Sequence, residues 1–136
     1  MRIFLGANVL FSATKSDDAV AALVKRLLQA GHECCADGYV IEEARRNLAA
    51  KAPDGVAVLD ALLERLNVVA AATAHGDSGV IDWLPEKDRP VLAAAIRFRC
   101  AALVSGDRAH FGAGYGKSFG GVTIYSPRSL AEALLK

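Results

Sequence analysis

Apolar residues gather in short runs along the chain, and the segments between the runs carry apolar residues at helical spacing. The runs lie at residues 2–5, 33–36, 67–70, 102–105 and 122–125. Short apolar runs bounded by turn residues are typical of buried strands. Strands that alternate with helices favour a parallel sheet with helices on both faces. The pattern therefore predicts a three-layer α/β/α domain with a five-stranded, mainly parallel sheet.

The segments between the runs also contain helix-ending residues. The clearest helix follows a candidate cap at residues 16–18 and stops before Gly31. Its apolar face holds Val20, Leu23, Val24, Leu27 and Leu28. We expect further helices at about 40–51, 54–66, 88–99 and 127–135. Residues 71–87 and the glycine-rich segment 112–121 are expected to be mobile loops.

Size and composition limit the class of protein. A chain of 136 residues predicts one domain, residues 1–136, with a single core. No apolar run approaches the roughly 20 residues of a membrane span, and the N-terminus leads directly into a strand rather than a secretion signal. Cys34, Cys35 and Cys100 form neither a disulfide framework nor a metal-binding spacing. We therefore expect a protein of the reducing cytoplasm that does not enter a membrane.

Polar residues follow two of the predicted strands. The first strand leads into Gly6 and Asn8, and the strand that ends at Ser105 leads into Asp107. Ligands of open α/β sheets bind just outside the carboxyl ends of the strands. These two turns are therefore where we expect the chemistry of the protein.

Three acidic residues are candidates for that chemistry, and each has a structural alternative. Asp88 and Asp107 could serve only as caps of the helices that they precede. Glu43 is harder to explain in this way, because it lies on an early helical turn between the apolar Ile41 and Ala44. Clustered carboxylates repel one another unless a cation lies among them. Together the three predict a site for a cation.

Basic residues accompany all three acidic residues, although the net charge of the chain is only +1. Arg45 and Arg46 follow Glu43, Lys87 and Arg89 flank Asp88, and Arg108 follows Asp107. Two interpretations stay open. The charges form ordinary surface pairs, or they make a cationic rim that receives the phosphates of a nucleic acid around an acidic centre.

Two other classes of site have little support. Gly116, Lys117 and Ser118 resemble the end of a P-loop, but Phe111 occupies the position of its first glycine, and the segment leads into a strand. No nucleophile elbow accompanies the histidines. Among them, His110 follows Asp107 closely, and two interpretations stay open: it contacts a substrate, or it has a structural role near a helix start.

Four segments resemble, in order, the motifs of PIN domains (PilT N-terminus nucleases, which include the VapC-type toxins). They are Leu5–Leu10, Tyr39–Leu48, Glu86–Ala95 and Ser105–Asp107. The resemblance spans nearly the whole chain. It implies a PIN-like fold, a divalent-metal-dependent ribonuclease that uses Mg²⁺ or Mn²⁺, and RNA as substrate. It also implies a toxin with a separate antitoxin protein as partner, and a homodimer.

The resemblance assigns roles to residues of this chain. It implies that Glu43, Asp88 and Asp107 are catalytic residues and metal ligands, with Asn8 and Ser105 orienting a ligand or a metal-bound water. Mg²⁺ and Mn²⁺ suit such oxygen-rich sites, and they provide charge neutralisation and a nucleophilic water for phosphodiester cleavage. Substrate-binding roles fall to basic side chains around this centre: Arg45, Arg46, Arg89, Arg108 and His110.

Gly6 departs from the motif, because PIN domains have a metal-binding Asp at this position. Three interpretations remain open. Gly6 is an engineered or selected change that silences a toxic nuclease, a natural loss in a domain that binds without cutting, or a variant in which Asn8 or a neighbouring Asp takes over. We expect weak metal binding and an impaired enzyme. The alternative is a non-catalytic module that binds RNA or protein through the same cleft.

Overall fold

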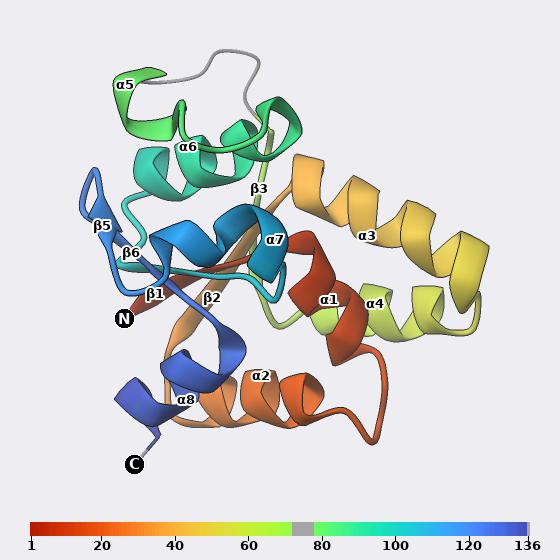
Figure 1. Cartoon of the computed structure of the whole chain (residues 1–136). Coiled ribbons are helices and arrows are strands. Elements are labelled where there is room, and N and C mark those ends of the chain that lie inside the picture. Colours follow the sequence, from red (N-terminus) through yellow and green to blue (C-terminus); the bar gives the residue numbers. More distant parts are fainter. Residues whose placement is uncertain (72–77, 136) are drawn as a thin grey trace.

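A six-stranded sheet forms the centre of the protein (Figure 1). The computed structural model describes residues 1–71 and 78–135. The strands are β1 (Arg2–Leu5), β2 (Glu33–Asp37), β3 (Asn67–Val69), β4 (Ala102–Val104), β5 (Ser118–Phe119) and β6 (Val122–Tyr125). They lie in the order β3-β2-β1-β4-β6-β5, and every neighbouring pair is parallel except β5 and β6. The predicted α/β architecture is confirmed, with one strand more than expected.

The additional strand comes from the glycine-rich segment, which was expected to be a loop. Residues 112–114 form the short helix η2 (Gly112–Gly114), and β5 then pairs with β6 as a hairpin. The hairpin turn contains Gly120 and Gly121 with φ angles of 58° and 87°, which glycine adopts without a steric penalty. Phe119 stacks on Trp83 with ring centroids 4.8 Å apart. The glycines therefore build a tight turn, and the loop prediction was wrong.

Helices cover both faces of the sheet. Figure 1 shows α2 (Ala19–Gln29) and α8 (Pro127–Leu134) on one side, and α5 (Ser78–Ile81) and α6 (Arg89–Arg97) on the other. The other helices are α1 (Ala7–Ala13), α3 (Gly38–Lys51), α4 (Gly55–Leu63), η1 (Glu86–Asp88) and α7 (Arg108–Phe111). Of these, α1 follows the carboxyl end of β1 directly, and α3 follows that of β2. Part of the segment 71–87, expected to be a loop, thus forms α5 and η1, and residues 72–77 lie outside the described residues.

Side-chain caps and glycine set the helix ends that the sequence predicted. Asp18 accepts a hydrogen bond from Val20 N at 2.7 Å and starts α2, and Gly31, with a φ of 87°, follows its end. Asp37 starts α3 in the same way by accepting from Val40 N at 3.1 Å. These local interactions explain why the helix boundaries could be read from the sequence to within a few residues.

The core is densest around β1, where Ile3, Phe4 and Leu5 are completely buried. All three cysteines are buried and free, and they pack as small apolar side chains. Among the described residues, no helix is both long and apolar enough to cross a bilayer. Burial on this scale is the main favourable contribution to folding and holds the central strands rigid.

The order of the strands decides where a ligand can bind. The chain runs outward from β1 through β2 to β3, and then returns to place β4 on the other side of β1. The direction of winding therefore reverses between β1 and β4. In open α/β sheets the crevice at such a reversal, at the carboxyl ends of the strands, is the usual ligand site.

Candidate active site

The residues that follow β1 and β4 lie side by side at this reversal. Gly6 N donates to Val104 O at 3.0 Å, so the two strands stay joined up to the point where both chains turn away. A cavity of about 180 Å³ lies next to this point. It is lined by Gly6, Ala7, Asn8, Glu43, Asn47, Lys87, Asp88, Val91, Ser105, Asp107 and Phe111. The structure thus brings Glu43, Asp88 and Asp107 to one cavity, beside Asn8 and Ser105.

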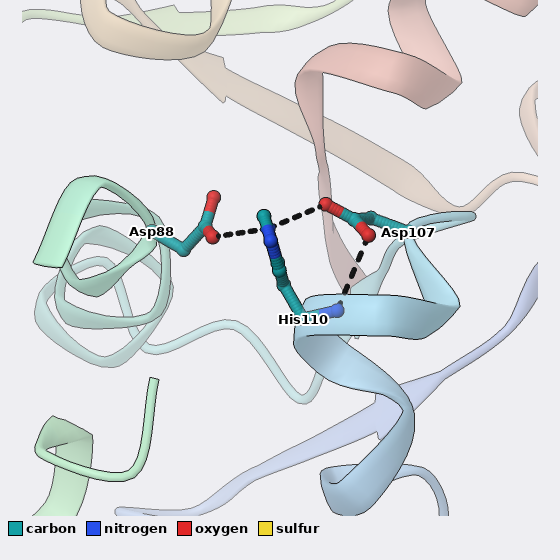
Figure 2. Close-up of side chains that lie close together, drawn as sticks. All are labelled: Asp88, Asp107 and His110. Atoms are coloured by element: carbon teal, nitrogen blue, oxygen red, sulfur yellow. Dashed lines mark hydrogen bonds and ion pairs between the residues drawn. The ribbon is translucent and has the colours of Figure 1, made fainter. Parts of the chain in front are cut away.

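Two of the carboxylates meet at a histidine. Figure 2 shows the imidazole of His110 between Asp88 and Asp107. His110 Nδ1 lies 2.9 Å from Asp88 Oδ2 and 2.9 Å from Asp107 Oδ2. One donor atom from each of the three side chains lies within 4.8 Å of the others. This cluster could hold a metal ion, and the imidazole of His110 is part of it.

The hydrogen bonds at the helix starts show which of the two aspartates caps a helix. Asp88 occupies the cap position of α6, but its side chain accepts no capping hydrogen bond. Asp107 does cap α7, because its Oδ1 accepts from His110 N at 3.2 Å. Its Oδ2 faces the imidazole instead. Asp88 is therefore free of the structural role, and Asp107 combines a cap with a group that faces the cluster.

Burial shapes the electrostatics of the cluster. Asp88 is 7% exposed, and this burial is the main reason why its pKa is raised; the charge of Asp107 adds to the effect. The positive charge of Lys87 and the contact with His110 act in the opposite direction. A buried carboxylate beside a second one is stabilised by a cation between them. The site therefore favours a positively charged ligand.

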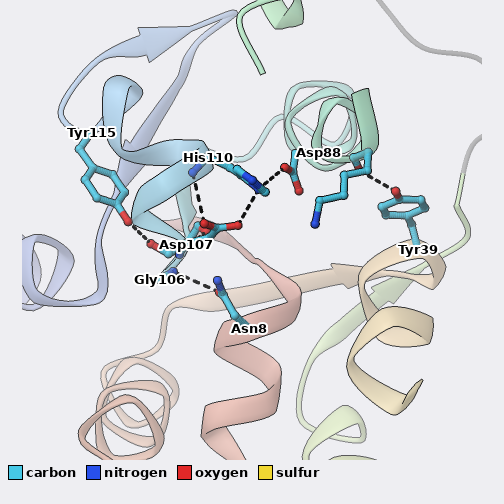
Figure 3. A network of polar contacts seen from close by, with 9 residues as sticks. Asn8, Tyr39, Asp88, Gly106, Asp107, His110 and Tyr115 are labelled. Atoms are coloured by element: carbon cyan, nitrogen blue, oxygen red, sulfur yellow. Dashed lines mark hydrogen bonds and ion pairs between the residues drawn. The ribbon is translucent and has the colours of Figure 1, made fainter. Parts of the chain in front are cut away.

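Neutral groups hold the turn after β4 in place (Figure 3). Asn8 Oδ1 accepts from Gly106 N at 3.1 Å, and Ser105 Oγ accepts from Asp107 N at 3.1 Å. The Tyr115 hydroxyl donates to Ser105 O at 2.7 Å. These bonds position the backbone that carries Asp107, so Asn8 and Ser105 lie where the sequence placed them.

Helix α3 supplies another side of the cavity. Glu43 and Asn47 lie one turn apart on α3 and both line the cavity. Glu43 is half-buried and makes no hydrogen bond or ion pair with any residue that the structure describes. One turn before it, the Tyr39 hydroxyl donates to Lys87 O at 2.5 Å and joins α3 to η1 (Figure 3). Glu43 is thus available to a ligand but does not touch the histidine cluster.

Gly6 leaves room that a larger residue could use. Its φ of −69° and ψ of 164° are ordinary extended values, so its backbone does not require glycine. A Cβ built there would lie 3.2 Å from Val104 O, 3.6 Å from Asn8 Oδ1 and 3.7 Å from the Ser105 Cβ. Only the contact with the Val104 carbonyl is tight, so a side chain at residue 6 requires the backbone there to shift by a few tenths of an ångström. A side chain at residue 6 would border the cavity.

The predicted substrate-binding arginines differ in their surroundings. Arg45 pairs with Asp60 at 2.6 Å, and Arg89 donates to Leu84 O at 2.9 Å and to Asp82 O at 3.2 Å. Arg46 and Arg108 are exposed and make no ion pair with any described residue. Arg45 and Arg89 therefore have structural partners, while Arg46 and Arg108 are the arginines left for a phosphate. All four substrate roles stay predictions.

Sequence reasoning missed several residues around the cavity. Asn47 lines it, and Tyr39 and Tyr115 hold its edges. Lys87 also lines it; the sequence had offered Lys87 only as one member of a basic rim. The spacing of Tyr39, Glu43 and Asn47 along one face of α3 was a signal that could have revealed two of them. Nothing in the local sequence indicated the hydroxyl bond from Tyr115, because it depends on how η2 packs against β4.

Solved structures match nearly the whole chain, although no family model and none of the curated proteins matches its sequence. VapBC2 from Rickettsia felis, bound to a DNA fragment from its promoter, gives a TM-score of 0.65 at 16% identity over 93% of this chain and 98% of that one. VapC20 from Mycobacterium tuberculosis, a sarcin–ricin loop cleaving toxin, gives 0.60 at 15% identity over 86% and 98%. FitAB bound to an IR36 DNA fragment gives 0.62 at 15% identity over 92% and 94%.

The chain has the fold of a PIN domain. This confirms the resemblance that the motifs indicated, at the level of the fold. Sequence identities of 15% and 16% do not carry residue roles from one protein to another. The chemistry of this PIN fold therefore rests on its own cavity and on the Asp88, Asp107 and His110 cluster.

Proposed function

We propose that this PIN fold is a divalent-metal-dependent endoribonuclease whose activity is reduced by Gly6. The observation that carries the proposal is the convergence of Asp88, Asp107 and His110 beside a cavity that Glu43 also lines. Carboxylates that separate elements bring to one cavity repel one another unless a cation lies among them. A metal-dependent nuclease places such a cation there to cleave a phosphodiester. VapC20, which shares the fold, is a toxin that cleaves the sarcin–ricin loop.

The residues present fit a divalent ion. Asp88 Oδ2 is a buried oxygen without a hydrogen-bond partner, and a carboxylate oxygen of Asp107 lies within 4.8 Å of the donor atoms of Asp88 and His110. Asp88 and Asp107 would hold the ion, with Glu43 as a further oxygen donor. Mg²⁺ and Mn²⁺ both accept such carboxylates. When bound, the ion supplies positive charge to the scissile phosphate and lowers the pKa of an attacking water.

The remaining residues bind and position the substrate. Asn8 and Ser105 hold the turn that carries Asp107, so that its carboxylate keeps its direction during the reaction. Lys87 adds positive charge at the wall of the cavity. Arg46 and Arg108 are exposed and can bind phosphates of a single-stranded RNA that crosses the cavity.

We further propose that the protein is the toxin of a toxin–antitoxin pair in the cytoplasm and that it forms a homodimer. The support is the fold shared with VapBC2 and FitAB. Exposed apolar side chains at Val58 and Val68 are available for such contacts. A monomeric mass across micromolar concentrations would contradict the homodimer.

An RNA cleavage assay tests the enzyme. Purified full-length protein, its Asp88→Asn variant and its Gly6→Asp variant are incubated with a pool of single-stranded RNA and Mn²⁺ or Mg²⁺, with and without EDTA. We expect weak metal-dependent cleavage by the wild type, stronger cleavage by Gly6→Asp, and none by Asp88→Asn. Cleavage that survives in Asp88→Asn would contradict the proposal. RNA binding without cleavage by any form would assign the chain to the non-catalytic binding class, which the missing carboxylate at residue 6 favours.

A further inference from the structure

The imidazole of His110 presents one nitrogen to two carboxylates. Nδ1 lies 2.9 Å from Asp88 Oδ2 and from Asp107 Oδ2. A nitrogen of the ring carries at most one hydrogen, so Nδ1 cannot donate a full hydrogen bond to both oxygens. Nδ1 and Asp88 Oδ2 are buried, and neither has a hydrogen-bond partner among the described residues. Three donor atoms thus converge, and two of them, His110 Nδ1 and Asp88 Oδ2, are buried without the hydrogen bonds that would satisfy them.

The spacing of these atoms is the spacing of ligands around one ion. Adjacent ligands of an octahedral ion with bonds of about 2.1 Å lie about 3 Å apart. The two contacts of Nδ1, at 2.9 Å each, correspond to two such edges (Figure 2). The Asp88 side chain is only 10% exposed, so bulk water does little to satisfy its charge. A divalent ion would satisfy all three donors together.

Residue 6 does not provide a donor, and Asn8 is already engaged. Gly6 lines the same cavity without a side-chain oxygen. Asn8 Oδ1 accepts from Gly106 N at 3.1 Å and is held by that bond. Within the described part of the chain, Asp88, Asp107 and His110 form the one cluster of three His, Cys, Asp or Glu side chains close enough to share an ion. His110 is therefore the side chain placed to compensate for the missing carboxylate.

We propose that His110 Nδ1 is the third metal donor of this site, in place of a carboxylate at residue 6, and that the site therefore binds Mn²⁺ more tightly than Mg²⁺. The inference rests on the metal site of the proposed function. A neutral imidazole with its hydrogen on Nε2 presents a lone pair at Nδ1. Mg²⁺ prefers oxygen and keeps its waters, whereas first-row transition ions gain from an imidazole ligand.

Calorimetric titration without RNA tests the preference. Mn²⁺ and Mg²⁺ are titrated separately into the full chain, His110→Gln and His32→Gln. His32 is the matched control, because it lies before β2, at the amino end of the sheet, and loses the same ring. We expect wild type and His32→Gln to bind Mn²⁺ about tenfold more tightly than Mg²⁺. His110→Gln should lose about tenfold in Mn²⁺ affinity and less than about threefold in Mg²⁺ affinity.

Pulsed electron paramagnetic resonance of the Mn²⁺-loaded wild type gives a second measurement, which detects a nitrogen ligand directly in the unaltered chain. We expect modulation from a directly coordinated ¹⁴N nucleus, absent in His110→Gln. Any of three results would overturn the inference: no nitrogen modulation in the wild type, no Mn²⁺ binding at all, or Mn²⁺ binding by His110→Gln that equals or exceeds the wild type. The last would mean that the imidazole blocks the ion.

The outcomes separate this inference from the proposed function. Nitrogen-coordinated Mn²⁺ without RNA cleavage would support the role of His110 and contradict the nuclease. Metal-dependent cleavage without nitrogen modulation would support the nuclease and contradict the role of His110.

Discussion

The cavity at the carboxyl edge of the sheet has two unlike walls. The charged wall consists of Asp88 and Asp107 together with His110, which contacts both carboxylates but does not itself line the cavity; one donor atom of each lies within 4.8 Å of the others. The open wall consists of Gly6, Glu43 and Asn47. On the open wall, Gly6 has no side chain and Glu43 has no polar partner among the residues that the structure describes. Both walls belong to the same site, but only the side chains of the charged wall converge and contact one another.

This difference shows how the site would bind a ligand. Direct contacts of the His110 imidazole with both carboxylates hold the charged wall in one arrangement, because each group depends on the others. Glu43 is half-buried and can move toward or away from a ligand. An ion would therefore be held mainly by the charged wall, and changes to the two walls should have unequal effects.

The largest effect should come from removing one carboxylate of the charged wall. Asp107→Asn is expected to lower Mn²⁺ affinity and RNA cleavage by about 100-fold or more, and Glu43→Gln by about tenfold, because metal ligands matter at least as much as the residues that support them. Asn keeps an acceptor for the cap of α7. Calorimetry and the cleavage assay measure both variants. Equal losses would show that the walls contribute alike.

A carboxylate added to the open wall should make the walls more alike. Gly6→Asp and the neutral control Gly6→Asn both place a capping oxygen at the start of α1, so only charge distinguishes them. Without metal, Gly6→Asp should melt below Gly6→Asn because of repulsion by Asp88 and Asp107. With metal at about 100 times its Kd, the unfolding free energy of Gly6→Asp should rise by about 2.7 kcal/mol. Thermal melts with and without metal measure the change. A Gly6→Asp melting temperature that does not rise with metal would contradict the prediction.

A smaller effect is expected at the basic rim. Arg46→Ala should weaken binding of single-stranded RNA by a few-fold, with the loss greatest at low salt, because one phosphate contact disappears. Arg45→Ala is the matched neighbour: Arg45 already pairs with Asp60, so its loss should change RNA binding much less. Fluorescence anisotropy at two salt concentrations compares them. Equal effects would mean that Arg45 leaves Asp60 to bind RNA.

The smallest effect concerns a carboxylate outside the cavity. Burial raises the pKa of Asp37 above its unfolded value, so its contribution to stability is present below the unfolded pKa and is lost as the pH rises through the folded pKa. Asp37→Asn keeps an acceptor for Val40 N and does not titrate. The variant should therefore gain unfolding free energy relative to the wild type between acidic and neutral pH. Urea unfolding at several pH values measures this, and a trend of the opposite sign would contradict it.

The sequence was sufficient for the elements and for the candidate residues. Alternating apolar runs and helical periods are local, and caps such as Asp18 act within a few residues. They therefore predict strands, helices and their order. The order of strands then places the turns after β1 and β4 at one edge, which led to Asp107, Asn8 and Ser105. The prediction for the glycine-rich segment failed because glycine is compatible with both a loop and a tight hairpin turn. Pairing with β6 decided between them.

Only the tertiary structure decided how the side chains meet. From the sequence, the one chemical role that we could assign to His110 was a contact with substrate. The direction of its ring depends on how α7 packs beside the start of α6. The same holds for Asp88: the sequence left open that it only caps a helix, and the structure shows that its side chain makes no capping hydrogen bond. Local sequence sets the periodicity of each element, whereas the relative rotation of two elements depends on packing between residues far apart in the chain. The sequence by itself therefore determined most of the elements and the acidic candidates, and the placement of α7 beside η1 determined that a histidine lies between two of them.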